Sequence, residues 1–215
     1  MGKEKYLRKI EGLFRRSPIV DAKSISRLIG SKKQIKQYDK QLIRNLILKG
    51  KIKKLTKGHY TLHDDPSLIV LCFSPAYLGL QDALSFHGLW EQETVPVIVT
   101  AKRARQGIRK VLEVNVLIRR INRRYILGIE YRRHGDFYLP VSDVEKTFID
   151  MIYFRERMDK DLLENFRKRI NIKKLEEYLQ KYPEKIKTKA LRGLARNPRP
   201  LLRARPSGRG GRHWS

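Results

Sequence analysis

Cysteine is almost absent from this 215-residue sequence, in which Cys72 is the single thiol. One thiol excludes a disulfide framework and a cysteine-based zinc cluster within the chain, and it favours a reducing, cytoplasmic setting. Long hydrophobic runs are missing as well, because the longest, residues 68–73, is far shorter than the roughly 20 residues that span a bilayer. We therefore expect no membrane partner, and the charged first residues predict no signal peptide.

The sequence also lacks the motifs of metal and nucleotide enzymes. Its five histidines do not show the His-Glu-x-x-His spacing of zinc hydrolases, and neither a Walker-type loop nor a G-x-G-x-x-G run occurs. His87 invites a catalytic interpretation, but it shares the apolar face of an expected helix with Leu80 and Leu84, which favours a hydrogen-bonded core histidine. We expect no metal, no cofactor and no catalytic residue.

Acidic residues are scarce. The chain holds 22 of them against 49 lysines and arginines, which gives a formal net charge of +27. An excess of this size is typical of a protein whose partner is a polyanion, above all nucleic acid. Residues 1–62 carry 18 of the basic and only 4 of the acidic residues, so the positive charge is densest in the N-terminal part.

This N-terminal part has the element order of a winged helix-turn-helix. Apolar residues at helical spacing predict a helix over residues 3–15, and Asp21 can cap a second, shorter helix. A third helix is expected over residues 32–49, followed by a hairpin. The two strands of the hairpin are expected at residues 52–55 and 59–62.

The third helix has two distinct faces, as a recognition helix does. When Ile35 is set at the centre of the buried face, steps of about 100° per residue place Asp39, Leu42 and Leu46 near it. The opposite face would enter the major groove of double-stranded DNA, where Gln pairs with adenine and Arg or Lys with guanine. The candidate base-reading or phosphate-contacting residues of that face are Lys33, Gln37, Lys40, Gln41 and Arg44.

The hairpin is the expected wing. Two adjacent lysines interrupt the alternation of its first strand, and either a bulge or a short strand would account for this. Basic side chains on a wing reach a neighbouring phosphate or the minor groove, and phosphate contacts position a protein without reading the sequence. The candidate wing residues are Lys53, Lys54, Lys57 and His59.

A second, mixed region follows the polar break at residues 64–66. Residues 67–73 fit either a buried strand or the start of a helix, and a helix is expected over residues 79–88. Ser142 and Glu145 have the spacing of a capping box. Strands are expected at residues 95–100, 111–119, 125–131 and 136–139, and further helices at 146–157, 160–170 and 172–182, the last two behind Asp159 and Asn171 as caps.

From residue 190 the composition changes to arginine, proline and glycine. Such a tail buries too little apolar surface to order itself, so we expect disorder. It could add phosphate contacts. It could instead be vector-derived or the product of a shifted reading frame, because its residues favour GC-rich codons and those of the rest of the chain favour AT-rich ones. The sequence thus predicts an α+β protein: an N-terminal winged helix-turn-helix (residues 1–63), a mixed α/β domain with a small sheet and C-terminal helices (67–189), and the tail (190–215).

Several stretches together resemble the AbiEi family of antitoxins and winged-helix transcriptional regulators. They lie at residues 57–62, 77–89, 97–100 and 140–150, within a resemblance that covers roughly residues 5–180. The resemblance implies an antitoxin that represses its own operon through the winged helix. It also implies a partner, an AbiEii-like nucleotidyltransferase toxin, countered with help from the C-terminal domain. An operator with two half-sites would suit a homodimer or two monomers.

Two other classes of function stay open. Asp143 and Glu145 could belong to the metal site of a nuclease, although such carboxylates usually converge from neighbouring strands and these open a helix. The winged helix could instead dock a partner protein, although its recognition face is basic rather than acidic or apolar. The arginine clusters of residues 102–133 could extend the DNA footprint, bind RNA, face an acidic partner or form a solvated surface.

Overall fold

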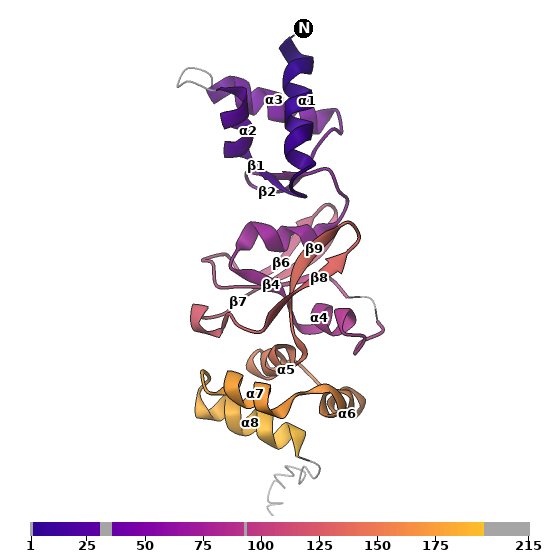
Figure 1. Ribbon diagram of the computed structural model, residues 1–215, viewed down its shortest axis with the longest axis vertical. Coiled ribbons are helices and arrows are strands. Elements are labelled where there is room, and N and C mark those ends of the chain that lie inside the picture. The colour runs from indigo at the N-terminus through magenta and orange to yellow at the C-terminus, as the bar shows by residue number, and fades with distance from the viewer. Residues whose placement is uncertain (1, 31–35, 93, 196–215) are drawn as a thin grey trace, which may run out of the picture.

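The structure is a computed structural model that describes residues 2–30, 36–92 and 94–195, with side chains from residues 6 and 38 onward in the first two stretches. Figure 1 shows an elongated α+β chain, with the N-terminal helices at one end, a sheet in the middle and the last helices at the other end. Within the described ranges, no helix is both long and apolar enough to cross a membrane.

The N-terminal segment, residues 2–61, packs three helices against a small antiparallel sheet with the strand order β1-β3-β2. Ile10, Ile25 and Leu46, one from each helix, share a buried cluster with Ile52. The helices are α1 (Gly2–Phe14), α2 (Ala22–Ile29) and α3 (Lys36–Leu48), and the strands are β1 (Val20–Asp21), β2 (Lys53–Thr56) and β3 (His59–Thr61).

Local sequence signals set most of these elements. Asp21 caps α2 as predicted, because its carboxylate accepts a hydrogen bond from the backbone N–H of Ser24 at 2.7 Å. Of the two explanations for the interrupted alternation in β2, the structure supports the bulge, because the register of β2 on β3 shifts between Lys54 and Thr56. The sequence does not predict β1, since a strand of two residues is too short to show an alternation.

The middle of the molecule is a six-stranded mixed sheet with the order β6-β7-β5-β4-β9-β8. β4 runs parallel to β9 and β5 parallel to β7, whereas β4 pairs with β5 antiparallel. The outer pairs β6–β7 and β8–β9 are antiparallel hairpins. The strands are β4 (Ala76–Leu78), β5 (Val97–Thr100), β6 (Gly107–Val111), β7 (Val114–Arg120), β8 (Ile129–His134) and β9 (Phe137–Ser142).

The single strand predicted over residues 111–119 is wrong, because the chain reverses inside it. Val111 ends β6 and Val114 begins β7, and the two residues are paired across the turn. Leu112 and Glu113 between them have φ angles of 47° and 66°. A two-residue turn with two positive φ angles normally carries Asn or Gly, so the residue types here do not predict it.

Two other stretches in which a strand was expected or possible contain a 3-10 helix instead. The strand expected from residue 125 starts later, because Tyr125 ends a short 3-10 helix, η3 (Arg123–Tyr125), and β8 begins after Gly128. Of the two possibilities for residues 67–73, the helical one is confirmed, as η2 (Pro66–Phe73) is a 3-10 helix whose side chains are almost all buried.

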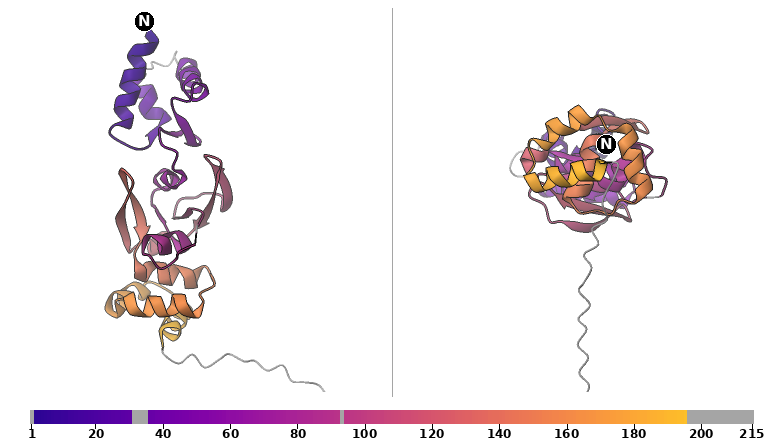
Figure 2. Two further views of the ribbon diagram at one scale, coloured as in Figure 1. Left: turned by 90° about the vertical axis from the view of Figure 1, so that its right-hand side faces the viewer. Right: turned by 90° about the horizontal axis from the view of Figure 1, so that it is seen from below.

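Helices cover both faces of the sheet. η2 packs on one face, and Figure 2 shows the two hairpins rising on either side of it. α4 and α5 pack on the other face through Leu84 and Phe148, and the remaining helices lie beyond them. These helices are α4 (Leu80–Phe86), α5 (Val144–Tyr153), α6 (Lys160–Arg169), α7 (Ile172–Leu179) and α8 (Glu184–Leu194).

The capping box expected at Ser142 and Glu145 is wrong. Ser142 is still the last residue of β9, so α5 begins one residue later and Asp143 is its cap, accepting from the N–H of Lys146 at 2.7 Å. Glu145 accepts instead from the backbone N–H of Asn171 at 2.8 Å, which ties α5 to the start of α7. The caps expected for α6 and α7 are confirmed.

The unstructured tail expected from residue 190 does not begin there, because α8 continues to Leu194. Ala190 is completely buried on this helix. The last helix expected from the sequence ends before Pro183, but proline suits the start of a helix and here occupies the position that precedes α8. The rest of the predicted tail, residues 196–215, lies outside the described residues.

Buried contacts cross the polar break at residues 64–66. Leu55 of β2 belongs to the apolar cluster that η2 forms with the sheet, and Ile19 packs against the same cluster. Asp65 lies 2.8 Å from the imidazole of His134 on β8. The N-terminal segment therefore packs on η2 and is not connected to the second region by a flexible linker alone.

Candidate nucleic-acid interface

α3 separates an apolar face from a polar one, as its sequence predicts. Ile43 and Leu46 are buried, and Asp39, which the helical spacing places on the same face, is only 4% exposed. Three of the predicted recognition residues are exposed on the other side of the helix, namely Lys40, Gln41 and Arg44.

The other two predicted recognition residues lie at or beyond the start of α3. Lys33 lies outside the described residues, and so does Ile35, which was expected at the centre of the buried face. Gln37 is in the first turn of α3, and its side chain is not among those described.

Leu48 also lies on this exposed side, although it is not among the predicted recognition residues. It is 74% exposed and follows Arg44 by four residues, one turn further along α3. An apolar residue near the end of a helix is easily assigned to the core. Its spacing from Arg44 was the signal that could have found it.

The four predicted wing residues separate into different groups. Lys54 pairs in register with Tyr60 on β3, and both lie beside α3. Lys53 is turned away and forms an ion pair with Asp64. Lys57 is exposed in the turn of the hairpin, and its carbonyl oxygen lies 3.3 Å from Nδ1 of His59.

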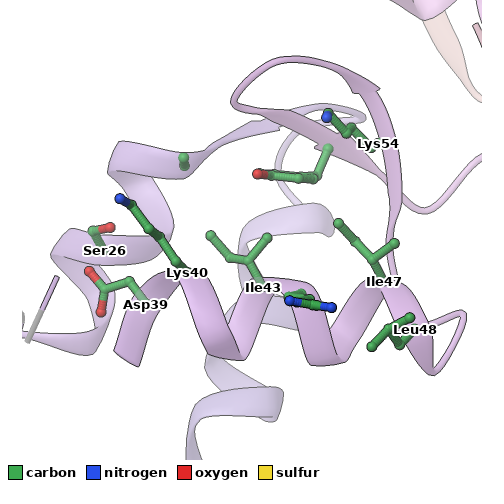
Figure 3. A pocket seen from close by; sticks show the side chains of 10 residues that line it. Ser26, Asp39, Lys40, Ile43, Ile47, Leu48 and Lys54 are labelled. Carbon is green, nitrogen blue, oxygen red and sulfur yellow. The ribbon is translucent and has the colours of Figure 1, made fainter. Parts of the chain in front are cut away.

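A groove of about 500 Å³ runs between α2, α3 and the β2–β3 hairpin (Figure 3). Its floor is apolar and includes Ile43 and Ile47 of α3 and Tyr60 of β3. Its rim is polar and basic, with Lys40 and Arg44 on one side and Lys54 on the hairpin opposite, and the full lining is Ala22, Ser26, Asp39, Lys40, Ile43, Arg44, Ile47, Leu48, Lys54 and Tyr60.

The basic side chains of the rim are not held in ion pairs by the acids that the structure describes. Among the described residues, no ion pair involves Lys40, Arg44 or Lys54. The one carboxylate that lines the groove is Asp39, whose Oδ1 is buried and receives no hydrogen bond from the part of the chain that the structure describes. The rim can therefore attract anions.

The arginine clusters of the second region lie in varied settings. Arg119 forms an ion pair, because its guanidinium lies 3.1 Å from the carboxylate of Glu156. Thr100 at the end of β5 and Arg120 at the end of β7 are register partners, so the loops after these strands leave the sheet side by side. Their exposed cations are Lys102, Arg103, Arg105, Arg120, Arg123 and Arg124.

Asp143 and Glu145, the carboxylates considered for a nuclease metal site, form hydrogen bonds and ion pairs with other residues of the chain. Asp143 accepts from the hydroxyl of Tyr178 at 2.9 Å, besides capping α5. Lys174 lies 3.0 Å from Asp143 and 3.3 Å from Glu145. Burial opposes the charge of Lys174, but the two carboxylates raise the pKa of its ammonium group above its ordinary value. Within the described residues, no group of three His, Cys, Asp or Glu could hold a metal.

His87 is the hydrogen-bonded core histidine that its position predicts. It is buried, and its Nε2 donates to the carbonyl oxygen of Ser142 at 2.7 Å.

Comparison with known proteins gives a likeness in fold. No protein-family model matches the chain, and no curated protein matches it. Three solved chains do match. One is the RV2827C protein from Mycobacterium tuberculosis, which is 18% identical, aligns with 87% of this chain and 75% of its own, and has a TM-score of 0.59. At this identity the match shows a shared α+β fold.

Proposed function

We propose that the N-terminal segment is a winged helix-turn-helix that binds double-stranded DNA, and that the protein is a sequence-specific transcriptional regulator rather than an enzyme. The observation that carries the proposal is the basic side of α3 beside the basic β2–β3 hairpin, where Lys40, Arg44 and Lys54 form no ion pair among the described residues. The element order α1-β1-α2-α3-β2-β3 supports it, because a winged helix has this order of helices and strands.

In this proposal α3 enters the major groove. Arg44 reads guanine and Gln41 reads adenine, each contact contributing about 1–3 kcal/mol of discrimination. Gln41 donates to Oδ1 of Asn45 at 3.2 Å, which orients its amide for such a contact. Leu48 lies on the same side and would touch a thymine methyl group. Lys54 and Lys57 of the hairpin contact phosphates and set the position of α3.

The further role as an antitoxin rests on the resemblance to the AbiEi family. We propose that the protein represses its own operon in the cytoplasm, as a homodimer or as two monomers on paired half-sites. Its partner would be an AbiEii-like nucleotidyltransferase toxin. The exposed cations after β5 and β7 are available to an acidic partner or to further phosphates.

A mobility-shift titration with the upstream region of the protein's own gene tests the proposal. Wild-type protein should bind that region more tightly than an unrelated duplex of equal length. Arg44→Ala should weaken specific binding by about 10-fold or more, because it removes a base contact. Arg157→Ala is the matched control, since Arg157 is an exposed arginine just after α5. Equal binding to both duplexes, or equal effects of the two variants, would contradict a sequence-specific regulator.

A cleavage assay separates the regulator from a nuclease. Plasmid DNA and RNA incubated with the protein and magnesium should stay intact, because Asp143 and Glu145 hold protein donors. Magnesium-dependent cutting that Glu145→Ala abolishes would overturn the proposal in favour of an enzyme.

A further inference from the structure

The floor of the groove between α2, α3 and the hairpin is apolar and would not contribute to binding a phosphate. DNA backbones are recognised by cations and N–H donors, which the rim supplies. Ile43 and Tyr60 are buried beneath the opening, and Ile47 is half-buried beside them. An apolar surface at the bottom of a groove is stabilised when an apolar body covers it.

The size and charge of the groove indicate which class of ligand fits it. A volume of about 500 Å³ lies within the range of small-molecule sites, roughly 300–1,000 Å³. Lys40, Arg44 and Lys54 stand around the apolar floor, and no ion pair among the described residues neutralises them. A ligand that satisfies both parts has an apolar body and a negative head group.

We infer that this groove binds a small amphipathic carboxylate and that the bound ligand excludes DNA. The carboxylate pairs with the rim cations while the apolar body covers Ile43, Ile47 and Tyr60. The exclusion rests on the proposed function, because Lys40, Arg44 and Lys54 are also the proposed DNA contacts. One set of cations cannot serve both anions at once, so the ligand would release the regulator from its operator.

Ligand binding is measured first, without DNA. The full chain is titrated with the fluorescent amphipathic anion 8-anilinonaphthalene-1-sulfonate, which is then displaced with decanoate, decanol or decyltrimethylammonium. Decanoate should displace the probe at least about 10-fold better than the neutral and cationic analogues, because only it pairs with the rim. Equal displacement by all three, or none by decanoate, would overturn the inference.

Two variants place the site. Ile47→Ser removes apolar floor, and Ala22→Leu fills the groove from α2, so each should weaken decanoate binding by about 10-fold. Ile172→Ser is the matched control, because Ile172 is 51% exposed on α7 and should leave binding unchanged. Circular dichroism melts check that each variant folds. If the control weakens binding as much as the two groove variants do, the site lies elsewhere and the inference fails.

Competition with DNA is measured second, by fluorescence anisotropy of a labelled operator duplex. A decanoate concentration that weakens DNA binding of wild type by about 10-fold should weaken that of Ala22→Leu by only about 2-fold, because the variant binds decanoate about 10-fold less tightly. Decanoate binding without any effect on bound DNA would overturn the exclusion. If wild type binds no DNA at all, the proposed function fails, while the probe titration still decides whether the groove takes the ligand. Displacement of the probe by an acidic peptide but not by decanoate would assign the groove to a protein partner.

Discussion

Burial sets the ionisation of Asp82, a residue of α4 that lies against the start of β5. Its carboxylate accepts a hydrogen bond from the backbone N–H of Val97 at 3.2 Å and is otherwise shielded from water. Burial raises the pKa of Asp82 to about 7, with a smaller contribution from the charge of Asp65, although the hydrogen bond opposes the change.

The raised pKa makes folding depend on pH. Between about pH 4 and about pH 7 the folded chain holds a proton that the unfolded chain has lost, so stability falls as the pH rises through this window. Asp82→Asn keeps an oxygen for Val97 but cannot ionise. Between about pH 5 and about pH 8, wild type should lose about 2–3 kcal/mol relative to the variant in urea denaturation. Parallel pH dependence of the two proteins would show that Asp82 is not the group responsible.

Lys146 and Asp150 form a completely buried ion pair on α5. The hydroxyl of Tyr77 donates to the second carboxylate oxygen of Asp150 at 2.8 Å, and the ammonium group of Lys146 lies 5.1 Å from the centre of the Tyr77 ring. Burial raises the pKa of Asp150 above its ordinary value, although Lys146 counteracts the change. The pair thus joins α5 to β4 through a network that depends on each member.

Removing one member of this pair should cost more than removing both charges. Lys146→Met leaves a buried carboxylate unpaired, and we expect a loss of about 3–5 kcal/mol in the free energy of unfolding. Adding Asp150→Asn, which still accepts from Tyr77, should recover at least about half of that loss. Chemical denaturation of the two single variants and the double variant measures the coupling. Losses that simply add would mean that the two charges do not stabilise each other.

At the level of elements, Gly128 lies directly before β8 and packs against α5 and α7. Its φ angle is +61°, and its carbonyl oxygen accepts from the N–H of Asp143 at 2.8 Å. A Cβ atom there would lie 2.7 Å from the ring of Tyr178 and 2.9 Å from Cβ of Lys146. Only glycine satisfies both the backbone angle and the packing.

Gly128→Ala should therefore destabilise the protein by about 3 kcal/mol or more, because it combines a strained backbone with an overpacked contact. Gly135→Ala is the matched control: its φ angle is +59°, but nothing lies within 4 Å of the added Cβ. It should lose only about 1 kcal/mol. Thermal or urea unfolding of both variants compares them, and equal losses would mean that the contact with Tyr178 and Lys146 has no cost.

Three helix caps show where a local signal in the sequence was enough to predict an element. Helix caps at Asp21, Asp159 and Asn171 act within one turn, so their residue types suffice. β4 is only three residues long and is fixed by its neighbours β5 and β9. In the candidate site, the basic side of α3 could be predicted because its residues recur at helical spacing. The groove could not, because its lining comes from α2, α3 and the hairpin and forms no pattern along the chain.

At the level of the whole molecule, the concentration of positive charge in residues 1–62 should govern how the proposed DNA binding responds to salt. Each phosphate contact releases a counterion, so the logarithm of affinity falls with the logarithm of salt concentration. Lys54→Ala should weaken binding to all duplexes alike and make this slope shallower by about one. Lys51→Ala, the exposed neighbour outside the groove lining, is the control. A change in site preference with the slope unaltered would show that Lys54 reads bases instead.

The packing of Leu55 on η2 bears on how the proposed DNA-binding segment could be exchanged with that of another chain. β2 carries Lys54 toward the groove and Leu55 into the cluster under the sheet. A cut at the polar break would leave Leu55 and its partners on η2 exposed to water on the two separated pieces. To change the base preference proposed for α3, its exposed side chains should therefore be substituted within the intact chain. The β2–β3 hairpin then keeps its packing on η2.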